Sequence, residues 1–186
     1  MLRFDQGNAR FNCRSAAVII DEDHVLLHRL VGDPFWALPG GKVEFFENSD
    51  DTLKRELLEE LSIDSVVERH LWYVESFFEF SGKKYHELAN YFLVRLSSPQ
   101  KLPKTEAFRG IESDVDLEFR WFPLTDLANI DIRPRFLCSG LLDLPPETRY
   151  IKLNESAAYR VAGGIYPPAP TPPCMRIRTG RFIQNA

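Results

Sequence analysis

The sequence predicts an α+β protein in which long strands and one well-marked helix follow each other without a regular pattern. Residues 66–80 and 84–96 are rich in aromatic and β-branched side chains, and the Ser-Gly-Lys segment at 81–83 is typical of a hairpin turn. Residues 49–61 carry leucines every four positions, which predicts an α-helix. Because the strands and helices do not alternate as βαβ units, the pattern favours an α+β or sandwich arrangement over a doubly wound sheet.

A shorter hairpin is expected before the helix. Residues 15–20 form an apolar run, the acidic residues 21–23 provide a turn, and a second apolar run covers residues 25–30. The Pro-Gly-Gly segment at 39–41 ends any strand there and leaves the backbone free to approach another group closely. We therefore expect a functional loop at this point.

The predicted helix has a recognisable start. Asn48 is of a type that caps helices, and Asp50 and Asp51 suit the positive first turn. We place the helix from Ser49 to Leu61, with Leu53, Leu57, Leu58 and Leu61 on one side. Downstream, we expect a polar loop from 97 to 116, a strand at 117–122 and a helix near 135–142.

Composition narrows the class of protein. The 186 residues include 44% hydrophobic side chains, enough for one domain with a real core. A formal charge of −4 gives no general attraction to phosphate backbones, which argues against a polymeric nucleic acid as partner. Three cysteines without paired spacing favour a reducing, cytoplasmic location. No run of about 18 apolar residues is present, so no membrane span is predicted.

Three glutamates share one sector of the predicted helix. At about 100° per residue, Glu56, Glu59 and Glu60 fall beside one another, next to the leucine side. Such carboxylate clusters are usually solvated surface. Here, however, Glu44, Glu47 and a glycine-rich loop lie just upstream, and clustered hard oxygen ligands suit Mg²⁺, with Mn²⁺ as a possible substitute.

The spacing of these residues resembles a known family motif. Gly41 is followed by five residues and Glu47, and then by seven residues and the run from Arg55 to Ile63. This arrangement resembles the Nudix box, GX5EX7REUXEEXGU with U an aliphatic residue, at every fixed position except Ser62, where the family has glycine. Phe46 stands at a further position that is often glycine. Weaker resemblance extends over about residues 14–142.

The resemblance implies a Nudix fold, a mixed β-sheet between α-helices, which we place at residues 1–155. It implies hydrolysis of a nucleoside diphosphate linked to another group, with an altered helix end at Ser62. Glu47 and Arg55 would brace the site. The metal ligands would be three helix glutamates and a backbone carbonyl, namely those of Glu56, Glu59, Glu60 and Gly40.

Several alternatives stay open at this stage. Glu56 is the first choice for the general base, and an acid of a later loop, Glu112, Asp114 or Asp116, is the alternative. Nucleoside triphosphates, including oxidised ones, are favoured as the small-molecule substrate, while ADP-sugars and dinucleoside polyphosphates are alternatives. A second class of function is a Nudix-fold module that binds a nucleotide without cleaving it.

The remaining aromatic residues, histidines and cysteines are interpreted as structural. At strand spacing, aromatic side chains are more often core than base platforms, so no base pocket is assigned to them. The same holds for the histidines, and Cys138 is expected to be buried. The residues concerned are Trp36, Phe77, Phe78, Tyr85, Phe92, His28, His70 and His86.

The C-terminal residues 156–186 differ in composition from the rest of the chain. No acidic residue follows Glu155, and prolines occupy five of the seven positions 167–173. Such a segment is typical of a disordered or polyproline-like extension. Alternatively, it docks on its own domain or on a second copy, giving a possible homodimer.

Overall fold

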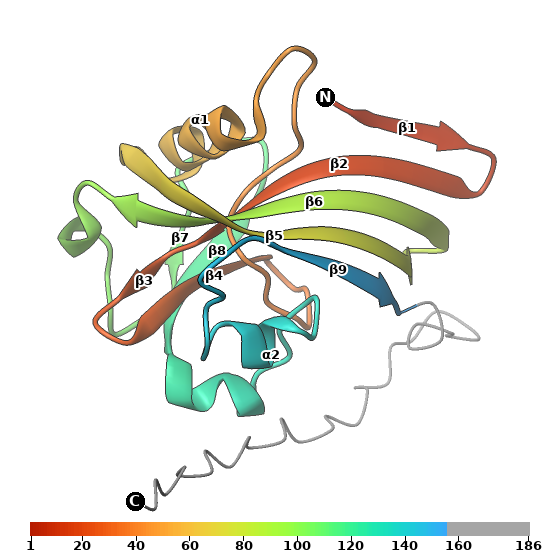
Figure 1. Cartoon of the computed structure of the whole chain (residues 1–186). Coiled ribbons are helices and arrows are strands. Elements are labelled where there is room, and N and C mark those ends of the chain that lie inside the picture. Colours follow the sequence, from red (N-terminus) through yellow and green to blue (C-terminus); the bar gives the residue numbers. More distant parts are fainter. Residues whose placement is uncertain (156–186) are drawn as a thin grey trace, which may run out of the picture.

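The computed structural model describes residues 1–155, so the proposed extension 156–186 lies outside the described residues (Figure 1). The strands and helices follow one another as β1 (Arg3–Gln6), β2 (Ala9–Val18), β3 (Ile20–Asp21), β4 (His24–Leu30), α1 (Ser49–Leu61), β5 (Ser65–Phe80), β6 (Lys83–Leu96), η1 (Pro99–Lys101), β7 (Phe108–Arg109), β8 (Leu117–Pro123), η2 (Leu124–Asn129), α2 (Leu137–Gly140) and β9 (Arg149–Asn154).

These strands form two sheets. The five-stranded sheet has the order β1-β2-β6-β5-β9 and is mixed, because β2 pairs with β6 and β5 with β9 in parallel while the other pairs are antiparallel. The four-stranded sheet, β3-β4-β8-β7, is antiparallel throughout. Figure 1 shows α1 on one side of the strands and α2 on the other. The predicted α+β class with a mixed sheet between helices is confirmed, although the strands divide between two sheets.

The long hairpin agrees with its prediction. β5 and β6 pair from Ser65 opposite Leu96 to Phe80 opposite Lys83. Ser81 and Gly82 in the turn both have positive φ, 49° and 75°, which is the backbone conformation that two-residue hairpin turns favour.

The N-terminal hairpin is only partly as expected. Residues 15–18 belong to β2 and pair with β6 in the five-stranded sheet, whereas the hairpin proper consists of Ile20 and Asp21 opposite Val25 and His24. The chain changes sheet at Ile19, whose carbonyl accepts a hydrogen bond from Leu26 N at 3.0 Å. Strands β1 and β9 lie at the edges of the large sheet and were not predicted, because short, polar edge strands carry little apolar alternation.

Helix α1 covers the residues predicted for it, but its sides and ends differ. Leu53, Leu57 and Leu61 are buried against the sheets, each worth about 1.5–3 kcal/mol of apolar burial. Leu58 is 49% exposed, and Thr52 and Glu60 occupy the buried side instead. The prediction that Leu58 lies on the buried side of the helix was therefore wrong, because Thr52 and Glu60 complete that side.

The ends of α1 also correct the sequence interpretation. The Asn48 side chain forms no cap, because its amide donates to Asp51 Oδ2 at 3.3 Å, while the Asn48 carbonyl accepts from Thr52 N at 3.0 Å. At the other end, Ser62 takes the left-handed conformation, φ 54° and ψ 37°, and its N–H bonds to the Leu58 carbonyl. The helix therefore ends with the geometry that glycine normally supplies, rather than with an altered end.

The C-terminal helix is shorter than expected. α2 covers only Leu137–Gly140, because Pro134 precedes it and Pro145 and Pro146 follow closely. Within the part of the chain that the structure describes, no helix has both the length and the apolar character needed to cross a membrane.

Candidate active site

The Gly40–Gly41 loop packs tightly on β2. Gly40 has φ +136°, and a Cβ there would lie 2.2 Å from the Ser15 carbonyl oxygen, so only glycine fits without a backbone shift. The Ser15 N–H donates to the Gly41 carbonyl at 2.9 Å and thereby holds the loop in place. The carboxyl group of Glu56 lies against Gly41 on the other side of the loop.

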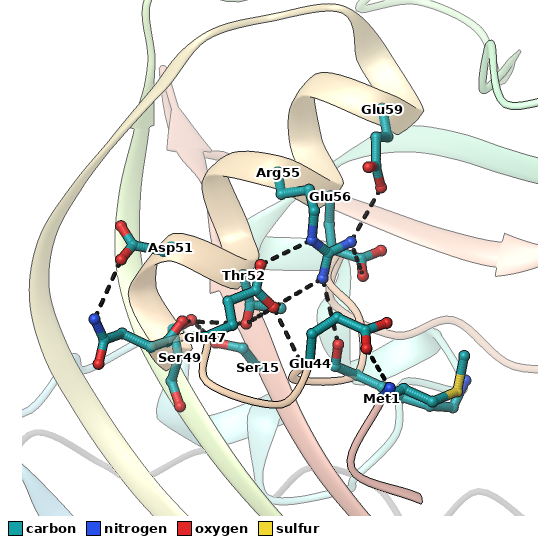
Figure 2. A network of polar contacts seen from close by, with 12 residues as sticks. Met1, Ser15, Glu44, Glu47, Ser49, Asp51, Thr52, Arg55, Glu56 and Glu59 are labelled. Carbon is teal, nitrogen blue, oxygen red and sulfur yellow. Dashed lines mark hydrogen bonds and ion pairs between the residues drawn. The ribbon is translucent and has the colours of Figure 1, made fainter.

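Arg55 is the centre of a network of charged hydrogen bonds (Figure 2). Its Nε and Nη2 donate to the two oxygens of Glu47 at 2.8 and 3.0 Å, a bidentate pair of the strongest kind in proteins. Nη1 donates to Glu56 at 2.9 Å and to Glu59 at 3.1 Å. The guanidinium group therefore joins the loop to the helix glutamates.

Glu47 is held from several directions besides Arg55. Its Oε2 accepts from the Glu44 backbone N–H at 3.0 Å and from the Thr52 hydroxyl at 2.8 Å. The hydrogen bonds from Arg55, followed by the weaker backbone and hydroxyl bonds, lower the pKa of Glu47 to about 2 against the opposing effect of burial. Glu47 is thus a fixed anion that orients Arg55.

The three helix glutamates line one cleft of about 490 Å³. Glu60 is 3% exposed, and its Oε2 has no hydrogen-bond partner among the described residues. Burial first, and then the charge of Glu56, raise the pKa of Glu60 to about 8. Burial also raises the pKa of Glu56, while the hydrogen bond from Arg55 opposes this. Arg55 bonds Glu56 and Glu59 in this cleft, whereas Oε2 of the buried Glu60 is left without a donor among the described residues.

The oxygen atoms expected to bind a metal ion share the cleft, but they do not form a coordination shell around one point. Among residues 1–155, no three side chains of the Asp, Glu, His or Cys type converge as ligands of one ion. Arg55 holds Glu56 and Glu59, and the Gly40 carbonyl accepts from Arg14 Nη2 at 3.0 Å. In this arrangement Glu56 and Glu59 are therefore bonded to Arg55 and do not converge with Glu60 on one point.

Of the later acids, the structure brings one into the cleft. Glu112 lines it, because the neighbouring Ile111 N–H donates to the Glu60 carbonyl at 2.9 Å and ties the loop to the end of α1. Asp116 is exposed and pairs with Arg109 at 2.7 Å, and Asp114 is also exposed. Neither of these two acids lines the cleft.

Sequence reasoning did not assign to the site four basic residues that line this cleft, because they lie on strands or beside the glycine loop with no local pattern of their own. They are Arg14, His28, Arg29 and Lys42. His28 was interpreted as structural, and it is indeed buried at 7% exposure, yet its Nδ1 has no partner in the described part of the chain. Burial, followed by the charge of Arg14, lowers the pKa of His28 to about 3.

The aromatic residues separate into two groups. Trp36 and Phe92 pack in the interior as expected, whereas Phe77 is 40% exposed. Phe78 and Tyr85 line a second cleft of about 340 Å³ and are therefore not simple core residues. The error arises because alternation along a strand shows on which face of the sheet a side chain lies. It does not show whether another part of the protein covers that face.

His86 and Cys138 both agree with the structural interpretation given to them from the sequence. His86 pairs with Glu75 at 3.1 Å, which fits a structural reading. Cys138 is buried, as predicted, at 4% exposure.

Comparison with known proteins establishes the family. The profile of the NUDIX domain matches residues 12–137. This chain belongs to the Nudix family. Over 102 residues it is 31% identical to the "Putative mutator protein MutT4" of Mycobacterium tuberculosis (strain CDC 1551 / Oshkosh), a match that covers 53% of this chain. The match spans only about a third, 36%, of that relative's length.

Solved structures share the fold. The mutator MutT protein from Bacillus halodurans is 17% identical, with a TM-score of 0.54 over 82% of this chain and 95% of its own. A Nudix hydrolase from Nitrosomonas europaea is 21% identical, with a TM-score of 0.50 over 77% and 78% of the two chains. A UDP-X diphosphatase is 19% identical, with a TM-score of 0.50 over 75% and 66%.

Proposed function

We propose that this chain is a Mg²⁺-dependent hydrolase, with Mn²⁺ as a possible substitute, that cleaves the diphosphate linkage of a nucleoside diphosphate joined to another group. Nudix hydrolases generally use divalent metal ions. The observation that carries the proposal is the buried Glu60, whose Oε2 lacks a partner in a cleft that also contains Glu56 and Glu59. Nucleoside triphosphates are the favoured substrates.

The residues present suit a hard divalent cation. A buried carboxylate without a donor is costly, and a cation beside Glu60 would remove that cost. Glu56, Glu59, Glu60 and the Gly40 carbonyl would hold the metal, all through oxygen atoms, which Mg²⁺ prefers. When bound, the metal neutralises phosphate charge and lowers the pKa of water.

The other residues of the cleft have distinct tasks in this proposal. Arg14 and Lys42 would attract the diphosphate, since both line the cleft beside the glutamates. Glu47 and Arg55 fix the position of the glycine loop relative to helix α1. Glu112 would accept the proton of the attacking water, because it lines the cleft and makes no bond to Arg55, whereas Glu56 is bonded to it. The products would be a nucleoside monophosphate and a phosphorylated remainder.

Two further inferences rest on the sequence alone and belong to this proposal. The cysteine content favours a cytoplasmic enzyme, and the acidic charge favours small-molecule rather than polymeric partners. Formation of a homodimer through residues 156–186 stays a prediction. Deletion of these residues followed by measurement of the oligomeric mass would test it, and an unchanged mass would contradict it.

A substrate screen tests the proposed activity. The purified chain with Mg²⁺ is incubated with nucleoside triphosphates, ADP-ribose, ADP-sugars, dinucleoside polyphosphates and NADH, and the products are separated by chromatography. We expect one class to be cleaved, chelation to abolish turnover, and Glu59→Gln and Glu60→Gln each to lower kcat at least about 100-fold.

Glu68→Gln is the matched control, because Glu68 is an exposed acid that pairs with Arg95 at 3.0 Å and does not line the glutamate cleft. Full turnover in chelator, or near-wild-type kinetics in both helix variants, would refute the metal-dependent mechanism. Nucleotide binding without any cleavage would instead support a non-catalytic Nudix-fold binding module.

A further inference from the structure

A second cleft adjoins the one that contains the glutamates. The two clefts share wall residues, among them Arg14, Phe35 and Lys42, so the aromatic cleft lies directly beside the glutamates. The volume of the second cleft, about 340 Å³, is near the lower end of the ~300–1,000 Å³ typical of small-molecule sites. It suits one nucleoside rather than a larger group.

The walls of the second cleft are flat and aromatic. Phe78 and Tyr85 stack with ring centroids 4.7 Å apart and planes only 7° from parallel. Phe35 meets Phe80 edge to face, with centroids 5.9 Å apart. Aromatic walls of this kind bind planar rings by stacking, a contact that every nucleobase offers.

Glu87 is one of two acids, with Glu155, that line this cleft. It lines the cleft on β6, opposite Asn12 of β2 and Ser76 of β5. In the described part of the chain, its carboxylate accepts a single long hydrogen bond, from Asn12 Nδ2 at 3.4 Å. Burial raises the pKa of Glu87, and the nearby Arg14 opposes the shift. The carboxylate therefore has unused acceptor capacity in a cleft that aromatic side chains share with Arg14 and Lys42.

We propose that the aromatic cleft binds the base of the nucleotide substrate and that Glu87 selects a base with two adjacent N–H donors, the pattern of guanine. A carboxylate offers two acceptor oxygens side by side, and paired N–H donors match them in a bidentate manner. Adenine and cytosine present one donor next to a ring acceptor, which the carboxylate repels. Uracil presents one donor between two acceptors. This inference deepens the proposed function and rests on it for the position of the phosphates.

Binding of nucleoside monophosphates to the full chain tests the inference without requiring hydrolysis. Calorimetric titration with GMP, IMP, AMP and UMP in Mg²⁺ should give the tightest binding for GMP. IMP, which lacks the exocyclic amino group, should bind about tenfold more weakly, and AMP and UMP more weakly still. Glu87→Gln should weaken GMP binding about tenfold and remove the preference over AMP.

Two further variants separate base selection from general damage. Glu79→Gln should leave all four affinities unchanged, because Glu79 alternates with Phe78 and Phe80 on β5 and so points to the opposite face of the sheet. Phe78→Leu should weaken all four monophosphates alike, about tenfold, since stacking does not depend on the base edge.

Equal affinity of the wild type for GMP and AMP, retention of the GMP preference in Glu87→Gln, or absence of binding by any monophosphate would each overturn the inference. Selective GMP binding without hydrolysis of any nucleotide would refute the proposed hydrolase and leave the base selection standing. The two proposals can therefore fail separately.

Discussion

The carboxyl group of Glu56 lies so close to the backbone of Gly41 that a Cβ on Gly41 would approach Glu56 Oε1 to 2.0 Å. The φ of Gly41 does not lie in the left-handed region, so the absence of a side chain is required by the neighbour rather than by the backbone conformation. Gly41→Ala should therefore displace Glu56 and leave the fold in place. We expect kcat to fall about 100-fold, the scale of a 1 Å misplacement in an active site, with little change in Tm.

Gly40→Ala is the contrasting variant. The added Cβ would lie 2.2 Å from the Ser15 carbonyl oxygen, and φ at this position is +136°. The substitution should therefore lower the stability of the folded protein. Thermal unfolding and kinetics of both variants distinguish the two cases. A Gly41→Ala protein with normal turnover would show that the position of Glu56 has no role in the reaction.

Arg55→Lys keeps the positive charge but loses the bidentate bond to Glu47. Because a lysine ammonium cannot bond Glu47, Glu56 and Glu59 in the same fixed geometry, we expect kcat to fall about 10-fold or more, as for other groups that orient metal ligands. Arg95→Lys, on an exposed pair with Glu68, is the control and should be neutral. Combining Arg55→Lys with Glu47→Gln should cost little more than either change alone, and fully additive losses would speak against a joint role.

His28 should make the fold sensitive to mild acid. Burial lowers the pKa of His28 from 6.5 to about 3. Between these two pH values, the imidazole therefore binds a proton in the unfolded chain but not in the folded protein. The stabilising contribution is therefore complete above pH 6.5 and is lost progressively as the pH falls toward 3. Between pH 6.5 and 5 Glu60, whose pKa is raised to about 8, gives a slope of the opposite sign, so the contribution of His28 is the difference between the slopes of the wild type and of a protein without this histidine.

Chemical denaturation across that interval provides the measurement. As the pH falls from 6.5 to 5, the free energy of unfolding of the wild type should decrease relative to that of His28→Leu. The exposed His24, bonded to the Glu22 carbonyl, serves for comparison, and His24→Leu should keep the wild-type slope. An identical slope in all three proteins would exclude His28 as the cause.

Ser62→Gly should stabilise the protein. Ser62 ends α1 with φ 54°, where a side chain is strained and glycine is not. We expect a gain of about 0.5–1 kcal/mol, or a rise in Tm of roughly 1–4 °C for a chain of this size. Ser98→Gly, at φ −147°, should give no gain. Loss of stability in Ser62→Gly would mean that a contact of the Ser62 side chain outweighs the backbone strain.

The parts of the fold that local patterns govern could be predicted well. Helix α1, the long hairpin of β5 and β6, and the common sector of Glu56, Glu59 and Glu60 all follow from periodicity and turn residues within a short stretch of chain. The bond between Arg55 and Glu59 follows from helical spacing in the same way, at 3.1 Å.

The pairing of distant segments could not be predicted. The local sequence of residues 15–18 is compatible with a place in either sheet. Only their pairing with β6 places them in the five-stranded sheet. The same limit applies to Glu112, which no local pattern distinguishes from Asp114 and Asp116. The bond from Ile111 N to the Glu60 carbonyl brings Glu112 into the cleft and leaves the other two acids outside it.

By itself, the sequence determined the glutamate helix, the glycine loop before it and the family to which the chain belongs, because each depends on residues close together along the chain. Only the tertiary structure decided that Glu60 is buried, that Arg14 and Lys42 join the glutamate cleft to an aromatic one, and that Glu87 lies within the latter. Burial and cleft formation depend on which strands and loops cover a side chain, and those contacts come from residues far apart in sequence.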